Sequence, residues 1–230
     1  MSYMIDPETR AALFDIDGTL TASGVWWAAI MDSPHTKLYK RLWLRGTAMP
    51  HYLLTKIGLA SQANFRNRWI RLMAWLMAGW SEDQVQVAYE ATLTTCLMPN
   101  VRSDVWDVLK RHKAAGQPVI LVSTMFEGIV HRFALRLGAD AGLGSIVEFD
   151  DGRCTGRIIG ETCSGGRKVD FARRYLEQHD PDLSLTVCAA YADSRSDIPF
   201  LDGVGFPVAT YPDEGMRAVA VERGWIIYEG

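Results

Sequence analysis

The sequence lacks the features that would place it in a membrane or in an oxidising compartment. Its 230 residues contain no stretch near the roughly 18 unbroken apolar residues that a membrane-spanning helix needs. The first residues show no basic region followed by an apolar one, so no export signal is expected. The four cysteines lie far apart, at positions 96, 154, 163 and 188, which argues against a disulfide framework and a zinc site. A reducing cytoplasm is therefore the expected location.

Acidic residues are almost absent from one segment of the chain. Between residues 21 and 80 there are eight lysines and arginines but a single acidic residue, Asp32, which gives a net charge of +7. The rest of the chain carries −10, and six of the eight tryptophans lie in the basic segment. This shift predicts an inserted segment that recognises an anion. A nucleic-acid partner is not expected, because the isoelectric point is about 6.0 and no binding motif is present.

Short apolar runs bounded by turn residues predict strands that are buried on both faces. Such runs cover residues 11–14, 119–122 and 185–190, and helical patterns cover 101–115, 126–137 and 168–178. The last part of the chain continues the alternation, with a strand near 206–209, a helix near 213–223 and a strand at 225–228. This alternation predicts an α/β fold with a doubly wound, mostly parallel sheet.

Residues 23–99 interrupt the alternation with helical patterns alone. Helices are expected around 24–32, 35–45, 48–58, 62–79 and 82–96, the last opened by a capping box in which Gln84 stands three residues after Ser81. We predict an all-helical cap over residues 23–99, inserted between the first two strands of a core formed by residues 1–22 and 100–230. An Asp-Gly turn also predicts a hairpin over residues 148–156.

Polar residues follow three of the predicted strands. They are Asp15 and Asp17, Ser123 and Thr124, and Asp193 and Asp197. In an open α/β sheet, ligands bind beyond the carboxyl ends of the strands, so these side chains should meet at one edge. Up to four crowded carboxylates need a compensating cation, and oxygen ligands favour Mg²⁺ over Ca²⁺. Lys168, after Gly165-Gly166, is the candidate for a second compensating charge.

These residues resemble the four motifs of the haloacid dehalogenase-like phosphatase superfamily. The sequence Asp15-Ile16-Asp17-Gly18-Thr19 matches the first motif, Ser123 the second, Lys168 the third, and Asp193 with Asp197 the acidic fourth. The motifs stand in the right order. The surroundings of Asp193 and the hairpin at 155–157 are similar to the subfamily that includes phosphoserine phosphatase, which has a helical cap between motifs one and two.

The resemblance implies a role for each residue. Asp15 is the expected nucleophile, which forms an aspartyl-phosphate, and Asp17 is the expected general acid and base. Ser123, Thr124 and Lys168 are expected to bind the phosphoryl group. Asp15, Asp193 and the backbone carbonyl of Asp17 are the expected Mg²⁺ ligands, and Asp197 is expected to orient Lys168 or a metal-bound water from behind.

Departures from the phosphoserine phosphatases bear on the substrate. Gly24 stands where those enzymes carry a glutamate for the substrate ammonium, although Glu127 is an alternative carrier of that charge. A milder departure is Ala192, where a glycine is usual. We therefore expect a Mg²⁺-dependent phosphomonoesterase for an anionic phosphate with an apolar part, such as a lipid-related phosphate.

Several alternatives stay open from the sequence. The same motifs would serve a phosphoserine phosphatase, or a phosphotransferase that uses an acceptor alcohol in place of water. The tryptophans either fill the core of a small helical bundle or, with the cations, face a substrate or an anionic membrane surface. A protein that keeps the fold but only binds anionic membranes is the alternative from outside the enzymes. The sequence does not indicate the oligomeric state.

Overall fold

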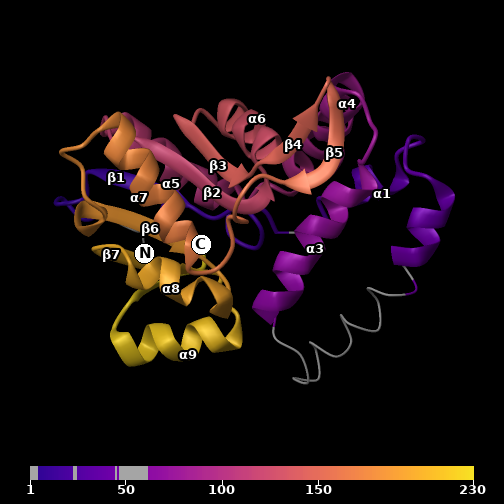
Figure 1. Cartoon of the computed structure of the whole chain (residues 1–230). Coiled ribbons are helices and arrows are strands. Elements are labelled where there is room, and N and C mark those ends of the chain that lie inside the picture. Colours follow the sequence, from indigo (N-terminus) through magenta and orange to yellow (C-terminus); the bar gives the residue numbers. More distant parts are fainter. Residues whose placement is uncertain (1–4, 23–24, 45, 47–61) are drawn as a thin grey trace.

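The computed structural model describes residues 5–22, 25–44, 46 and 62–230, and a six-stranded sheet forms its centre (Figure 1). The order β3-β2-β1-β6-β7-β8 corresponds to Ala141–Ser145, Val119–Phe126, Ala11–Phe14, Cys188–Ala192, Phe206–Thr210 and Ile226–Tyr228. Every pair in this sheet is parallel. The strand order reverses between β1 and β6, where ligands bind in such sheets. The predicted doubly wound α/β fold is confirmed.

Helices cover both faces of the sheet. Ala12 and Phe14 of β1 belong to the same buried cluster as α5 (Ser103–Ala114) and α6 (Glu127–Leu137). Ala11 and Leu13 belong to a second cluster with α7 (Arg167–His179), α8 (Ile198–Asp202) and α9 (Glu214–Arg223). Because both faces are covered, β1 is apolar at all four positions without alternation.

The strands differ from the prediction in two places. The run at 185–190 begins as a 3-10 turn, Leu185–Val187, and becomes β6 only at Cys188. The sequence does not predict β3, because its two glycines weaken a strand pattern. Both glycines lie against α6: an added Cβ would meet the Val130 carbonyl group at 2.6 Å from Gly142 and the Glu127 backbone at 2.7 Å from Gly144. Close helix–strand packing therefore explains the glycines.

Helices occupy the described part of the chain between β1 and α5. They are α1 (Ala28–Asp32), a helix over residues 38–44, α3 (Gln62–Leu76) and α4 (Glu82–Thr92), which continues as a π-helical turn at Leu93–Leu97 and a 3-10 turn at Met98–Asn100. Ser81 and Gln84 form the predicted capping box. The helix predicted over 48–58 and Gly24 lie outside the described residues. Within the described ranges, no helix has the length and apolar character to cross a bilayer.

The ends of this helical segment meet beside the sheet. The amide of Ala22 donates to the Asn100 carbonyl at 2.9 Å, and the amide of Arg102 donates to the Leu20 carbonyl at 2.9 Å. The chain therefore leaves and re-enters the core at adjacent points, as an insertion requires. The exact boundaries at residues 23 and 99 stay a prediction.

The predicted hairpin is formed by β4 (Val147–Asp150) and β5 (Arg153–Ile158), with Asp151 and Gly152 at positive φ in its turn. It lies beside α3 and α4, at the end of the molecule away from α7 and α9 (Figure 1). The amide of Gly79 donates to the Cys154 carbonyl, and the amide of Cys154 donates to the Trp80 carbonyl, each at 2.8 Å. The hairpin thus attaches the inserted helices to a later part of the chain.

Candidate active site

The site lies at the carboxyl edge of the sheet, beyond β1 and β6. Phe14 pairs with Leu121 of β2 on one side and with Tyr191 of β6 on the other. The amide of Asp15 donates to the Tyr191 carbonyl at 2.9 Å, and the rings of Phe14 and Tyr191 stack with centroids 4.2 Å apart. These contacts fix the two strand ends from which Asp15 and Asp193 project.

Lys168 joins two of the carboxylates. Its Nζ lies 2.6 Å from Asp15 Oδ1 and 2.9 Å from Asp197 Oδ1, and all three side chains are buried. Burial alone would lower the pKa of Lys168, but the two carboxylates outweigh it and raise this pKa above its ordinary value. Burial raises the pKa of Asp15, and Lys168 opposes that rise. The lysine therefore stays charged and holds the ends of β1, α7 and α8 together.

Thr19 and Gly18 bring Asp193 against Asp15. The Thr19 hydroxyl lies 3.2 Å from Asp15 Oδ2 and 3.4 Å from Asp193 Oδ1, so it can donate to either carboxylate. Gly18 has a φ of +85°, and a Cβ at this position would lie 2.1 Å from Asp193 Oδ2. Only glycine permits this backbone conformation and this approach without strain. Residues 17–19, a common turn sequence, are thus part of the site.

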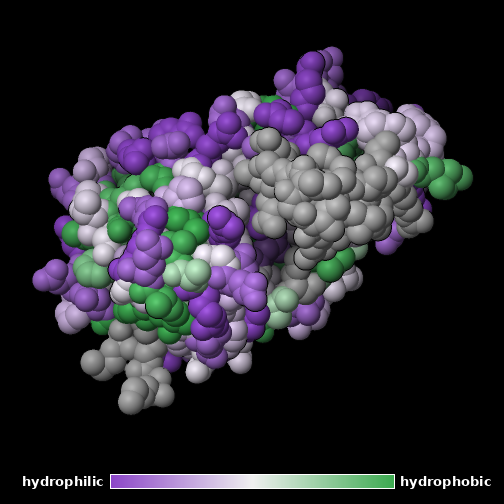
Figure 2. All heavy atoms as spheres, turned by 90° about the horizontal axis from the view of Figure 1, so that it is seen from below, coloured by the Kyte–Doolittle hydropathy of each residue, from purple (hydrophilic) through white to green (hydrophobic). Residues whose placement is uncertain are grey.

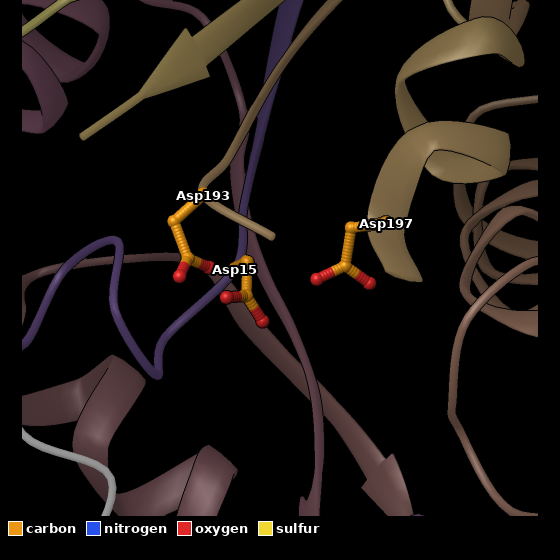
Figure 3. Close-up of side chains that lie close together, drawn as sticks. All are labelled: Asp15, Asp193 and Asp197. Atoms are coloured by element: carbon orange, nitrogen blue, oxygen red, sulfur yellow. The ribbon is translucent and has the colours of Figure 1, made fainter. Parts of the chain in front are cut away.

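The carboxylates form a compact group. Figure 3 shows Asp15 between Asp193 and Asp197, and one oxygen from each of the three lies within 4.8 Å of the others. Burial, followed by the charge of Asp15, raises the pKa of Asp17 and of Asp193 to about 8. Lys168 therefore does not compensate the whole group by itself.

The donor set fits a hard divalent cation. Asp17 Oδ1 is buried and has no hydrogen-bond partner within the part of the chain that the structure describes. The side chain of Asp197 is engaged by Lys168 and by the Ser194 hydroxyl, which donates to its Oδ2 at 3.2 Å. Asp15 is held by Lys168 in the same way. The donor set is therefore Asp15, Asp193 and Asp197 together, and oxygen donors of this kind suit Mg²⁺.

The two predicted phosphate-binding hydroxyls lie on β2. This strand continues to Phe126, so Ser123 and Thr124 lie within it and α6 begins only at Glu127. Ser123 is buried on the strand next to β1, and its Oγ accepts from the Met125 amide at 3.3 Å. Thr124 is half-buried, and its carbonyl accepts from the Ser145 hydroxyl at 3.0 Å. Their phosphate-binding role stays a prediction.

Arg66 of α3 also reaches the site, which the sequence does not indicate for this residue individually. Its guanidinium donates to the Ser194 hydroxyl at 3.3 and 3.4 Å, and also to the Ser196 hydroxyl. Burial dominates the raised pKa values of Asp17 and Asp193, and the charge of Arg66 opposes that rise. A cation of the inserted segment therefore reaches the carboxyl edge of the sheet, beside the acidic group.

Asn67 provides a second contact of α3 with the core. Its Oδ1 accepts from the Thr162 hydroxyl at 2.6 Å and from the Ser164 hydroxyl. Helical periodicity predicts α3, but it does not specify which loops of the core the helix faces. The sequence therefore predicts Arg66 and Asn67 only as residues of a basic helix, and not as contacts with the core.

Other cations of the basic segment have structural partners. Lys40 is buried, and its Nζ donates to the Trp75 carbonyl at 2.7 Å. Arg71 donates to the Gly160 carbonyl at 3.3 Å. Arg41 likewise donates to the Ser33 carbonyl. The expectation that the charge of this segment is directed at an anion is therefore too broad, because at least three of its cations bind backbone carbonyl groups.

The candidate site lies at the switch point of an α/β sheet, where ligands bind in folds of this class. The chain belongs to the haloacid dehalogenase-like hydrolase family, whose model matches residues 12–202. The predicted family and enzyme class are thereby confirmed.

Relatives extend over nearly the whole chain. The chain is 31% identical over 223 residues to the "Inhibition of morphological differentiation protein" of Streptomyces azureus, which covers 95% of this chain and 78% of that protein. It is 30% identical over 222 residues to the phosphoserine phosphatase SerB1 of Mycobacterium tuberculosis, which covers 95% of this chain and 70% of that protein. A solved structure of a protein with unknown function from Bordetella pertussis is similar with a TM-score of 0.81 at 25% identity, over 96% of this chain and 98% of that one.

Proposed function

We propose that this enzyme is a Mg²⁺-dependent phosphomonoester hydrolase that works through an aspartyl-phosphate on Asp15. The main support is the position of the Asp15 carboxylate, which is buried 2.6 Å from the Lys168 ammonium and shares a hydroxyl neighbour with Asp193. Asp15 and Asp193, with the backbone carbonyl of Asp17, would hold Mg²⁺. When bound, the ion would offset charge on the phosphoryl oxygens and keep the phosphoryl group in line for attack.

In the first half of the reaction, an oxygen of Asp15 attacks phosphorus and the ester P–O bond breaks. Asp17 gives its proton to the departing oxygen, so the alcohol leaves neutral. A pKa raised to about 8 suits this task, because it leaves the Asp17 carboxyl protonated near neutral pH. Lys168 balances the negative charge that accumulates at Asp15 and on the phosphoryl group.

In the second half, water attacks phosphorus and the bond to Asp15 breaks. Asp17, now ionised, takes a proton from that water, and inorganic phosphate leaves. Asp197 acts as a positioning residue, because its Oδ1 lies 2.9 Å from the Lys168 Nζ that also contacts Asp15. Ser123 and Thr124 would contribute hydroxyl groups to the phosphoryl oxygens.

Arg66 supports an anionic substrate chosen by the inserted helices. It donates to the hydroxyls of Ser194 and Ser196 at the edge of the site, and its charge opposes the rise in the pKa of Asp17 and Asp193 that burial causes. We propose substrates with a second polar or anionic group near the phosphate and an apolar part beyond it, such as lipid-related phosphates. Phosphoserine is the second candidate, favoured by the name of the mycobacterial relative.

We place the enzyme in a reducing cytoplasm. All four cysteines are free thiols in the structure, and Cys154, Cys163 and Cys188 are buried. Burial raises the pKa of the Cys163 thiol to about 12, which keeps it protonated and unreactive.

The test is release of phosphate from an aryl phosphate with Mg²⁺ and with EDTA. We expect Asp15→Asn to lower kcat by about 10⁴-fold or more, since the nucleophile is lost. Asp182→Asn, which changes an exposed aspartate, is the matched control and should retain full activity. Equal activity of wild type and Asp15→Asn, or full activity in EDTA, would disprove the mechanism.

A substrate panel then separates the two candidates. It compares kcat/KM for phosphoserine, sugar phosphates and lysophosphatidate at equal Mg²⁺. A preference for lysophosphatidate supports the apolar substrate, and a preference for phosphoserine replaces it. Addition of an alcohol acceptor reports phosphotransfer as a phosphorylated alcohol in place of free phosphate.

A further inference from the structure

The helix over residues 38–44 presents its side chains in an unusual arrangement. Its inward face buries Lys40 and Leu44, which are 5% and 1% exposed. Its outward face carries four large apolar or aromatic side chains: Leu38, Tyr39, Leu42 and Trp43 are 68%, 59%, 60% and 44% exposed. A helix at the surface of a globular protein normally turns its apolar stripe inward and its lysine outward.

The buried lysine has a local explanation, and one member of the exposed face also has a neighbour, since the ring of Trp43 lies 5.3 Å from the ring of Trp75. Lys40 donates to the carbonyls of Trp75 at 2.7 Å and Leu76 at 3.4 Å, where α3 ends. It therefore binds carbonyl groups of the last turn of α3, although the Trp75 carbonyl also accepts from the Ala78 amide at 3.2 Å. This contact fixes the rotation of the helix, and residues 38, 39, 42 and 43 then share one outward stripe.

The stripe lies at one extremity of the molecule. In Figure 2, hydrophobic side chains project at the far right end, where Figure 1 shows the indigo helix of residues 38–44. The active-site residues lie instead at the edge of the sheet, so the stripe is not a wall of the catalytic site. Several exposed large apolar side chains on one face of a helix are typical of an interaction surface.

Two partners could cover this stripe, a second copy of the chain or an anionic lipid bilayer, and the charge of the segment favours the bilayer. The segment from 21 to 80 has eight cations and the single anion Asp32, and Lys37 beside the stripe is exposed. A second copy packed on the same face would bring two such basic segments together, which like-charge repulsion opposes. Apolar and aromatic side chains flanked by cations are instead the composition of helices that lie in the interface of an anionic bilayer.

We propose that Leu38, Tyr39, Leu42 and Trp43 form a docking surface for anionic lipid bilayers. The two leucines enter the acyl boundary, and the ring of Trp43, with the phenol of Tyr39, lies at the headgroup level. Lys37 contacts lipid phosphate groups. This interaction does not depend on the proposed phosphatase reaction, because the stripe is separate from the carboxylate site.

Vesicle sedimentation tests the surface directly. Wild type is spun with vesicles of phosphatidylcholine alone and with vesicles containing about 30% phosphatidylglycerol, at low and at high salt. Phosphatidylglycerol is a phosphodiester and not a substrate for a phosphomonoesterase, so binding is measured without turnover. We expect binding to the anionic vesicles that weakens with salt. The Asp15→Asn protein should bind equally, which separates this test from that of the proposed function.

Two exposed leucines supply the decisive variant. Leu38→Gln combined with Leu42→Gln should lower vesicle affinity about tenfold or more, because two apolar side chains no longer leave water. Leu135→Gln combined with Val221→Gln is the matched control, since these residues are 65% and 69% exposed on core helices. Lys37→Gln should lower affinity for anionic vesicles about fivefold.

Three results would overturn the proposal. They are an absence of vesicle binding by wild type, equal binding by wild type and the Leu38/Leu42 variant, and a wild-type dimer in light scattering that this variant converts to monomer. The last result would assign the stripe to a second copy of the chain. Thermal melting of both double variants shows that a loss of binding does not reflect unfolding.

Discussion

Two buried lysines show how differently the two regions of the molecule use positive charge. Lys168 in the core is surrounded by carboxylates, and these raise its pKa despite burial. Lys40 in the inserted segment binds the backbone carbonyls of Trp75 and Leu76, and burial lowers its pKa. The core therefore uses its lysine to balance reactive groups, whereas the inserted segment uses its lysine to complete a helix end.

The same contrast holds for two arginines of α3. Arg66 reaches the Ser194 and Ser196 hydroxyls beside the carboxylates, while Arg71, five residues later, donates to the Gly160 carbonyl. One helix thus carries one cation that acts on the catalytic edge and another that attaches the helix to the core. The composition of a segment does not reveal which of its charges serve chemistry, because that depends on what each faces.

The largest effect should come from removing the core lysine. Lys168→Met leaves two buried carboxylates without their cation, so we expect kcat to fall about 10³-fold and the free energy of unfolding without Mg²⁺ to fall by about 3–5 kcal/mol. Lys40→Met is the counterpart in the inserted segment, and its kcat on a small aryl phosphate should stay within about twofold of wild type because Lys40 touches no reacting group. Steady-state kinetics and urea unfolding measure both.

An equal loss of kcat in the two lysine variants, with both folded by circular dichroism, would contradict the division between the regions. A variant Lys168→Arg refines the result. It keeps the charge but changes the donor geometry, so a partial recovery of stability with little recovery of kcat is expected.

The second effect concerns the contact between the regions. Arg66→Gln should lower kcat/KM about 10–100-fold, mainly through KM, because a cation beside the phosphate site is lost. Arg71→Gln on the same helix is the matched control and should change kcat/KM by less than about threefold. If Arg71→Gln has the larger effect, Arg66 does not face the substrate.

Much of the sheet and of the carboxylate site could be predicted from the sequence. The buried runs at 11–14 and 119–122 identify central strands, and Asp15, Lys168, Asp193 and Asp197 come together as expected from their motifs. Periodicity identifies the strands that Asp15 and Asp193 follow, whereas Lys168 lies in α7 and is identified by motif order alone.

Contacts between distant segments could not be predicted in this way. Arg66 and Ser196 are 130 residues apart, and their pairing depends on the rotation of α3 over the core. Strand β3 is not predicted from the sequence pattern, because its two glycines have low strand propensity and are needed for close packing against α6. The inverted orientation of the helix at 38–44 is equally hidden, since a lysine and several leucines in one segment normally predict the opposite arrangement.

The third effect is a pH dependence of stability that should arise in the carboxylate site and not in the inserted segment. Asp17 and Asp193 have pKa values raised from 3.8 to about 8, so the unfolded chain ionises from about pH 4 while the folded site still binds protons. The folded state then binds more protons, and stability without metal falls as pH rises from 4 to 8. Mg²⁺ favours the ionised carboxylates, so its stabilising effect on Tm should be larger at pH 8 than at pH 5, by about 5 °C.

Thermal melts at both pH values, with Mg²⁺ and with EDTA, measure this difference. Asp193→Asn should remove most of it, whereas Lys40→Met should retain it, because Lys40 binds backbone carbonyls and contacts none of these carboxyls. A Mg²⁺ shift that is the same at pH 5 and pH 8 would show that these carboxyls are not the groups that the metal engages.

The smallest effect should arise at the capping box of α4, within the inserted segment. The Ser81 hydroxyl accepts from the Gln84 amide at 3.3 Å, and the Ser81 amide donates to the Gln84 side chain at 3.0 Å. Ser81→Ala removes one of these bonds and should lower the free energy of unfolding by about 1 kcal/mol, with Ser81→Asp restoring most of it. Urea unfolding measures the loss, and kcat on an aryl phosphate should not change, since Ser81 lies on the hairpin side of α3. If kcat falls with stability, the helices of the inserted segment and the catalytic edge form one energetic unit, and the contacts of Arg66 and Asn67 are where that coupling would pass.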